Sequence, residues 1–140
     1  MLSINFLAVF LAAVSAFVIG FLLHGPVLGK LWMRLANIHP TGNEKLSDMY
    51  GQLFWNFVSN FVTALGLAFI YALTIGSPFM SSSLLLNGII SGLVVWFGFI
   101  VSGCSIEVIW MGRSYKLWLF EVFCSLLVMV TMGVIISAFS

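Results

Sequence analysis

A chain of 140 residues of which 62% are hydrophobic and 6% are charged cannot cover a water-facing surface with polar groups, since soluble domains carry about 25% charged residues. Most of its surface should therefore face lipid, and its length suits one domain. The formal net charge of +1 excludes a field that would attract nucleic acid, and the spacing of the two cysteines indicates neither a disulfide framework nor a metal site.

The first predicted span covers residues 2–23, close to the roughly 20 apolar residues that a transmembrane helix needs. No Lys or Arg precedes it, and it exceeds the about 7–15 apolar residues of a signal peptide, so we expect it to be retained. Gly25-Pro26 should end it. Every fourth residue on one face is small and should let another helix pack closely: Ala8, Ala12, Ala16 and Gly20.

The first connection covers residues 24–52. Within it, residues 29–35 should form a short helix at the membrane interface, because Lys30 and Arg34 lie four residues apart on one face with Trp32 beside them. We expect these three side chains to anchor the chain among lipid headgroups.

Three further apolar runs follow the first connection. They are predicted to span the membrane at residues 53–75, 84–106 (or as far as Met111) and 117–139. The runs do not alternate apolar and polar residues as the strands of a barrel would, so they should be helices. Gly112 should stop the third helix and form a tight hairpin with the fourth. The predicted fold class is all-α: one domain, 1–140, forming an antiparallel integral membrane four-helix bundle with a short interfacial helix after the first span.

Small and polar residues interrupt the second and third spans. Asn56 and Asn60 lie close to one face of the second helix, and they should point into the bundle because an amide facing lipid is costly. Gly88 and Gly92 lie one turn apart in the third span and should form another helix-packing surface.

The basic residues indicate how the bundle is oriented. All five Lys and Arg residues lie in or beside two connections, residues 24–52 and 112–116, and none lies on the other side. By the positive-inside rule we expect both connections in the cytoplasm and both termini outside, in the inner (plasma) membrane. Arg113 and Lys116 should anchor the connection at residues 112–116 among lipid headgroups.

Five polar side chains fall at similar depth. Because the hairpin at Gly112 folds the fourth span back along the third, a polar pocket is predicted in the cytoplasmic half, ringed by His24, Asn56, Asn60, Glu107 and Glu121. Ionisable residues inside a membrane are candidates for function. In the alternative interpretation both glutamates are structural and pair with neighbouring Arg or Lys, and the histidine forms a local hydrogen bond.

No chemical motif accompanies this pocket. The sequence contains no phosphate-binding glycine loop, no zinc protease motif and no serine hydrolase motif. We therefore predict no catalytic residue, no cofactor and no metal.

Several stretches resemble a known family. Ala13–Gly20, Gly25–Arg34, Trp96–Phe99 and Gly112–Leu119 are similar, in order and spacing, to the small bacterial membrane proteins grouped as domain-of-unknown-function family 1761. The resemblance covers nearly the whole chain, although the family often has aromatic residues where this chain has Leu23-His24. It implies a four-helix membrane fold and supplies no established activity or catalytic residues.

Three functions remain open from the sequence. The favoured one is an assembly protein that forms a homo-oligomer or docks onto a larger membrane complex, with membrane lipids as its surroundings and no nucleic acid partner. The second is a transporter or channel component for a small solute or ion, which uses the polar pocket. The third is a membrane enzyme acting on a lipid or other apolar substrate, with Glu121 or Glu107 as acid–base; it has the least support because no nucleophile and base are suitably spaced.

Overall fold

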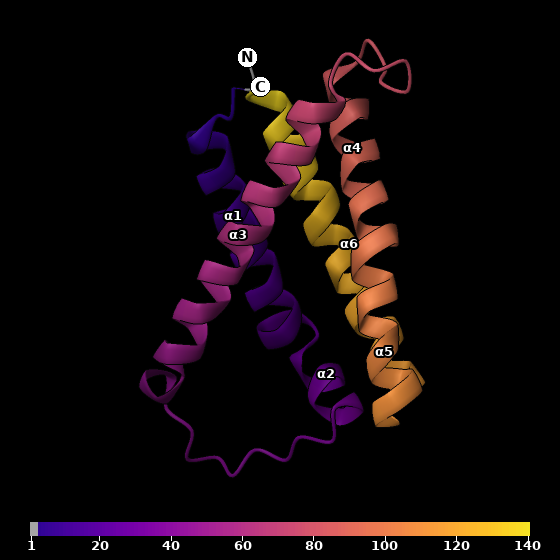
Figure 1. Ribbon diagram of the computed structural model, residues 1–140. Helices are drawn as coiled ribbons and strands as arrows, with labels where there is room; N and C mark the ends of the chain where they lie inside the picture. Colours follow the sequence, from indigo (N-terminus) through magenta and orange to yellow (C-terminus); the bar gives the residue numbers. More distant parts are fainter. Residues whose placement is uncertain (1–2) are drawn as a thin grey trace.

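The computed structural model describes residues 3–140 and contains four helices that are long and apolar enough to cross a membrane, which confirms the predicted fold class (Figure 1). These segments are Phe6–Val27, Leu46–Thr74, Leu84–Met111 and Tyr115–Ala138. In chain order the elements are α1 (Phe6–Leu22), η1 (Leu23–Val27), α2 (Gly29–Leu35), η2 (Leu46–Met49), α3 (Tyr50–Thr74), α4 (Leu84–Val95), η3 (Trp96–Val101), α5 (Ser102–Met111) and α6 (Tyr115–Ala138). Of the short segments, η3 is π-helical, η2 is a 3-10 turn, and η1 is a kink at which Gly25 leaves helical geometry.

The second span starts earlier than the sequence predicts, and the third reaches Met111, the longer of its two predicted ends. The second begins with η2, where the Asp48 carboxylate accepts a hydrogen bond from the backbone N–H of Lys45 (3.2 Å) and so caps the turn that leads into α3. The third ends where Gly112 adopts a left-handed conformation (φ 64°), which glycine adopts without steric cost. Because α6 starts at Tyr115, the two helices form the predicted tight hairpin.

Helix α1 ends at Leu22 and helical geometry breaks at Gly25-Pro26, where the sequence predicts the end of the first span. Gly25 leaves helical geometry (φ −120°, ψ −107°), so the chain is kinked at this point. Pro26 has no backbone N–H to leave unpaired at the bend. The predicted interfacial helix, α2, starts directly afterwards at Gly29, where a Cβ atom would lie 2.9 Å from the His24 carbonyl oxygen. The bend therefore brings α2 back against the end of the first span.

The small residues along α1 contribute to the core of the bundle. Ala8, Ala12 and Ala16 are buried, whereas Gly20 is half-buried. The central cluster joins α1 to α3 and α6 and contains Val9, Ala12, Ala13, Ala16, Ala64, Leu67, Ala68, Tyr71, Val95, Met129, Met132 and Ile136. The small face of α1 is thus used inside the chain.

Helices α4 and α6 approach each other closely enough for their backbones to touch. A Cβ atom on Gly92 would lie 2.5 Å from the Met129 carbonyl oxygen, and one on Gly88 would lie 2.5 Å from the Gly133 carbonyl oxygen. Only glycine fits at such distances. The glycines that the sequence assigns to helix packing therefore face α6 of the same chain.

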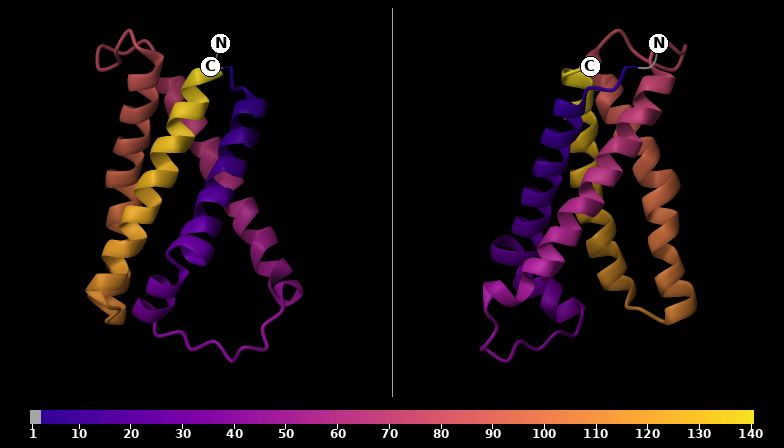
Figure 2. Two further views of the ribbon diagram at one scale, coloured as in Figure 1. Left: turned by 180° about the vertical axis from the view of Figure 1, so that it is seen from behind. Right: turned by 60° about the vertical axis from the view of Figure 1, so that its left-hand side comes forward.

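The helices are packed tightly at one end and spread apart at the other. We call the end that carries residues 24–52 and 112–116 the charged end, and the opposite end the termini end. Figures 1 and 2 show that α3 lies close to the other helices at the termini end and diverges from the α5–α6 hairpin toward the charged end. Residues 36–45 cross this wide side as an extended connection.

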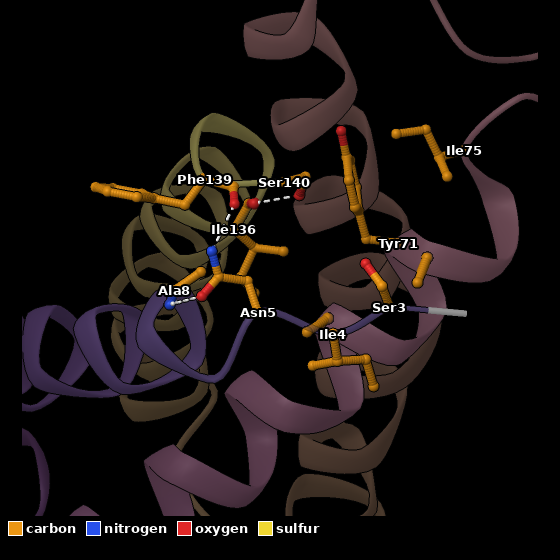
Figure 3. A pocket seen from close by; sticks show the side chains of 11 residues that line it. Ser3, Ile4, Asn5, Ala8, Tyr71, Ile75, Ile136, Phe139 and Ser140 are labelled. Atoms are coloured by element: carbon orange, nitrogen blue, oxygen red, sulfur yellow. Dashed lines mark hydrogen bonds between the residues drawn. The ribbon is translucent and has the colours of Figure 1, made fainter. Parts of the chain in front are cut away.

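Polar groups join α1 to α6 at the termini end (Figure 3). The Asn5 side-chain oxygen accepts hydrogen bonds from the N–H groups of Leu7 (3.0 Å) and Ala8 (3.2 Å), and its amide donates to the Phe139 carbonyl oxygen (2.8 Å). A cavity of about 330 Å³ lies beside them, and of the described residues that line it only Tyr71 has an ionisable side chain. The hydrogen bonds of Asn5 hold α1 against α6 at the termini end. The candidate functional site lies nearer the charged end.

Candidate functional site

A cavity of about 710 Å³ lies between the diverging helices in the half of the bundle nearer the charged end. Four of the five residues predicted to ring a pocket line it: His24, Asn56, Asn60 and Glu121. The other lining residues are Ala16, Gly20, Phe21, Gly25, Trp32, Leu46, Met49, Gln52, Leu53, Thr63, Ile100, Cys124, Ser125, Val128 and Met129. The cavity is therefore built from α1, η1, α2, η2, α3, η3 and α6, and most of its wall is apolar.

One wall carries a cluster of three hydrogen-bonding side chains. The His24 Nε2 atom lies 3.1 Å from Glu121 Oε2, and Trp32 Nε1–H donates to Glu121 Oε1 at 3.1 Å. The His24 Nδ1 atom lies 3.0 Å from the carbonyl oxygen of Gly20, one turn earlier on α1. The neighbouring segments η1 and α2 thus meet α6, which is distant in sequence, at one carboxylate.

The hydrogen-bond partners of the His24–Glu121 pair indicate how many protons it holds. A carbonyl oxygen can only accept, so Nδ1 of His24 must carry a proton and donate it to Gly20. Glu121 Oε1 already accepts from Trp32. The contact between Nε2 and Oε2 therefore contains one shared proton, carried by His24 in an ion pair or by Glu121 in a neutral pair. In both forms the pair has no net charge.

The pair is partly enclosed. The side chains of His24 and Glu121 are 30% and 37% exposed, and the histidine ring packs edge-on against Trp32 and Phe120, with ring centroids 5.2 and 5.6 Å apart. None of the described residues that line the cavity is Lys or Arg. Loss of the shared proton would therefore leave an uncompensated negative charge beside the cavity.

Polar groups on α3 line the cavity as well. The Asn60 amide donates to the side-chain oxygen of Asn56 (3.4 Å), one turn away, and the Thr63 hydroxyl donates to the Ser59 carbonyl oxygen (2.9 Å). Asn60 is half-buried and Asn56 is exposed, so the predicted inward face of α3 borders an open cavity instead of a closed core. An amide carries two N–H donors and an oxygen acceptor, so capacity remains here for a ligand.

The kinked segment η1 and the π-helical segment η3 border the site. The first, η1, carries His24 and Gly25, and the second, η3, contributes Ile100 to the cavity wall. Trp96 begins η3 and donates to the Val122 carbonyl oxygen (3.0 Å) and the Ser125 hydroxyl (3.2 Å), which fixes η3 against α6. An isolated π turn within an α-helix, such as η3, is frequently found at a functional site.

Glu107 lies apart from this cavity. Its carboxylate accepts a hydrogen bond from Arg113 at 2.7 Å, and their side chains are 48% and 54% exposed. It lines a separate cavity of about 200 Å³ together with Arg113, Cys104 and Glu121. The ion pair that the sequence offers as the structural alternative is thus present for Glu107, and Glu121 lies between the two cavities.

The residues predicted to anchor the chain at headgroups have two environments. Lys30, Arg34, Arg113 and Lys116 are exposed at the charged end. Trp32 is half-buried, and its ring N–H faces Glu121. The sequence does not indicate the contact between Trp32 and Glu121, because these residues lie 89 positions apart on different helices.

The arrangement of the cluster limits its chemistry. The ring nitrogens of His24 face Gly20 and Glu121, and the hydroxyls that line the cavity, Ser125 and Thr63, donate to backbone carbonyl oxygens. Within residues 3–140 no hydroxyl or thiol nucleophile is therefore hydrogen-bonded to the histidine. No group of three or more His, Cys, Asp or Glu side chains in the same range is placed to hold a metal ion. The cluster can hold and release a proton and can offer a carboxylate to a ligand.

Comparison with known proteins gives a family and no activity. A family model described as a protein of unknown function (DUF1761) matches residues 7–137. No curated protein matches the chain, and no solved structure matches it.

Proposed function

The chain belongs to DUF1761, a family of proteins of unknown function, and from its own site we propose that it is a small transport component that binds a small solute or ion in the cavity between α1, α3 and α6. The five Lys and Arg residues favour a cytoplasmic location for the charged end, which would place the cavity in the cytoplasmic half of the membrane.

A single observation carries the proposal: an ionisable pair inside two membrane-spanning helices lines an open cavity of about 710 Å³. Ionisable side chains at membrane depth are costly and generally belong to pathways for ions, protons or ligands. Binding cavities for small molecules typically have volumes of about 300–1,000 Å³, apolar walls and a few polar groups. The cavity combines both features.

Helix packing gives weaker support to an assembly role than the sequence suggested. The small residues that favoured oligomerisation contact other helices of the same chain: Ala12 and Ala16 lie in the central cluster, and Gly88 and Gly92 face α6. They are therefore used in folding the bundle.

An accessory subunit is the second candidate. The observation that favours it is the course of α3, which diverges from the α5–α6 hairpin (Figure 2). The cavity lined by α1, α3 and α6 is not fully enclosed. A second copy or a larger membrane complex would enclose this cavity. A membrane enzyme is not favoured, because no nucleophile in the described chain contacts His24.

Native mass spectrometry tests the proposal on protein extracted gently from its own membrane. Asn60→Phe would fill the cavity from α3, and Ser59→Phe, at the preceding exposed position, is the matched control. We expect a bound small mass on the parent and on Ser59→Phe, and its loss from Asn60→Phe.

Two outcomes would contradict transport. Equal small-molecule occupancy in all three proteins would show that the cavity is not the binding site. A fixed ratio to another protein, with no small mass, would instead favour the accessory subunit.

A further inference from the structure

We propose that the cavity binds an amphiphilic organic cation and that this cation replaces the proton shared by His24 and Glu121, so that one positive charge enters the site as one proton leaves. The inference rests on the proposed function, namely that this cavity binds a small ligand, and it specifies the class of the ligand and its coupling to protons.

The charge of the side chains that line the cavity favours a cation as the ligand. Glu121 is the one acidic residue and His24 the one basic residue among the described residues that line the cavity. With the shared proton the pair is neutral, and without it the pair carries one negative charge. A carboxylate in poorly hydrated surroundings needs a compensating partner, and the site offers two alternatives: a proton or a ligand cation.

The geometry of the His24–Glu121 contact makes the shared proton and a bound cation mutually exclusive. Without the proton, the lone pair of His24 Nε2 faces Glu121 Oε2 at 3.1 Å, and two acceptors at that distance repel. A cation that contacts the carboxylate relieves this repulsion, whereas a returning proton restores the original hydrogen bond and removes the charge that held the cation. Trp32 still donates to Oε1 in both states and keeps the carboxylate at the cavity wall.

The cavity wall favours an organic cation over a metal ion. Ca²⁺ takes about six to eight oxygen ligands and Mg²⁺ about six, and this wall supplies one carboxylate with amides on the neighbouring α3. Much of the remaining lining is apolar or aromatic, as in Phe21, Leu53, Ile100 and Val128. These side chains suit a cation that carries apolar groups, and aromatic faces attract such cations further.

Other titratable groups near the pair do not supply a competing charge. Cys124 on α6 lines the same cavity, and Cys104 on α5 lines the neighbouring one together with Glu121. Glu107 and Arg113 also border that second cavity, but they pair with each other at 2.7 Å and have no net charge together. Helix α3 contributes amides and a hydroxyl. The shared proton is therefore the group that a cation would displace.

Isothermal titration calorimetry of the full chain in lipid nanodiscs tests this with tetraphenylphosphonium. Titration in two buffers of different ionisation enthalpy gives the number of protons released per bound cation. We expect about one, together with an affinity that rises about tenfold per pH unit while the pair holds its proton. Glu121→Gln should abolish binding, and Glu107→Gln, on the neighbouring cavity, should leave it unchanged.

A second variant separates coupling from folding. His24→Gln keeps the carboxylate and a donor beside it, so it should still bind the cation while losing the steep pH dependence. Cation binding without proton release in the parent protein, or undiminished binding by Glu121→Gln, would overturn the inference.

A neutral probe distinguishes this failure from that of the proposed function. If triphenylphosphine oxide binds as tightly as the cation and Asn60→Phe removes it, the cavity binds ligands but does not select cations, and only the inference fails. If neither probe binds and native mass spectrometry shows no small mass, the proposed function fails as well.

Discussion

Substitution of Gly92 by alanine provides a direct measure of how closely α4 and α6 pack. The new Cβ atom would lie 2.5 Å from the Met129 carbonyl oxygen, roughly 0.9 Å inside the 3.4 Å at which ordinary contact begins, and 3.1 Å from the Val130 Cα atom. Because these are backbone atoms, the helices must separate. The Met129 carbonyl carbon would lie 3.0 Å away as well. Overpacking of this kind typically costs about 1–3 kcal/mol, and these three short contacts favour the upper part of that range.

A control substitution removes the opposing effect of helix propensity. Alanine is favoured over glycine within a helix by about 1 kcal/mol, so the change at Gly92 alone underestimates the packing cost. Gly103→Ala on α5 has the same propensity gain and meets no atom within 4 Å. We expect Gly103→Ala to be at least as stable as the parent, and Gly92→Ala to be less stable than Gly103→Ala by about 3 kcal/mol.

Unfolding by sodium dodecyl sulfate in mixed micelles, followed by circular dichroism, measures this difference in the free energy of unfolding. Equal unfolding midpoints for the two variants would refute the reasoning, because they would mean that α4 and α6 do not approach at Gly92.

Two further predictions concern the charged end. Gly29→Ala would place a Cβ atom 2.9 Å from the His24 carbonyl oxygen, so it should shift the His24 ring signals in NMR spectra, whereas Gly51→Ala, which meets nothing within 4 Å, should leave them in place. In the first connection, the backbone N–H of Thr41 lowers the pKa of the Glu44 carboxyl, so the turn should be most stable above the usual titration range of glutamate and should loosen as the pH falls through the lowered pKa. Hydrogen exchange of the Thr41 amide, corrected for intrinsic rate, should accelerate at acid pH and in Glu44→Gln at neutral pH; an unchanged rate in that variant would contradict this.

The sequence was enough to predict that the polar residues of the site lie at a similar depth in the membrane. His24 ends the first apolar run, Asn56 and Asn60 begin the second, and Glu121 lies shortly after the Gly112 hairpin. Depth along a spanning helix follows from residue number, because each residue adds about 1.5 Å. The structure brings these four residues to one cavity and leaves Glu107, which lies at a similar depth, beside Arg113.

The sequence by itself determined the class of the fold, since apolar runs of about 20 residues require helices in lipid and Gly112 stops one of them. Only the tertiary structure decided which partner each helix face meets: that Trp32 contacts Glu121, that Gly88 and Gly92 pack on α6, and that α3 diverges beside a cavity. The physical reason is that a spanning helix is apolar over most of its surface, so its hydrophobic pattern does not identify which neighbouring helix a given face will meet. Backbone approach and single hydrogen bonds make that choice, and both depend on residues distant in sequence.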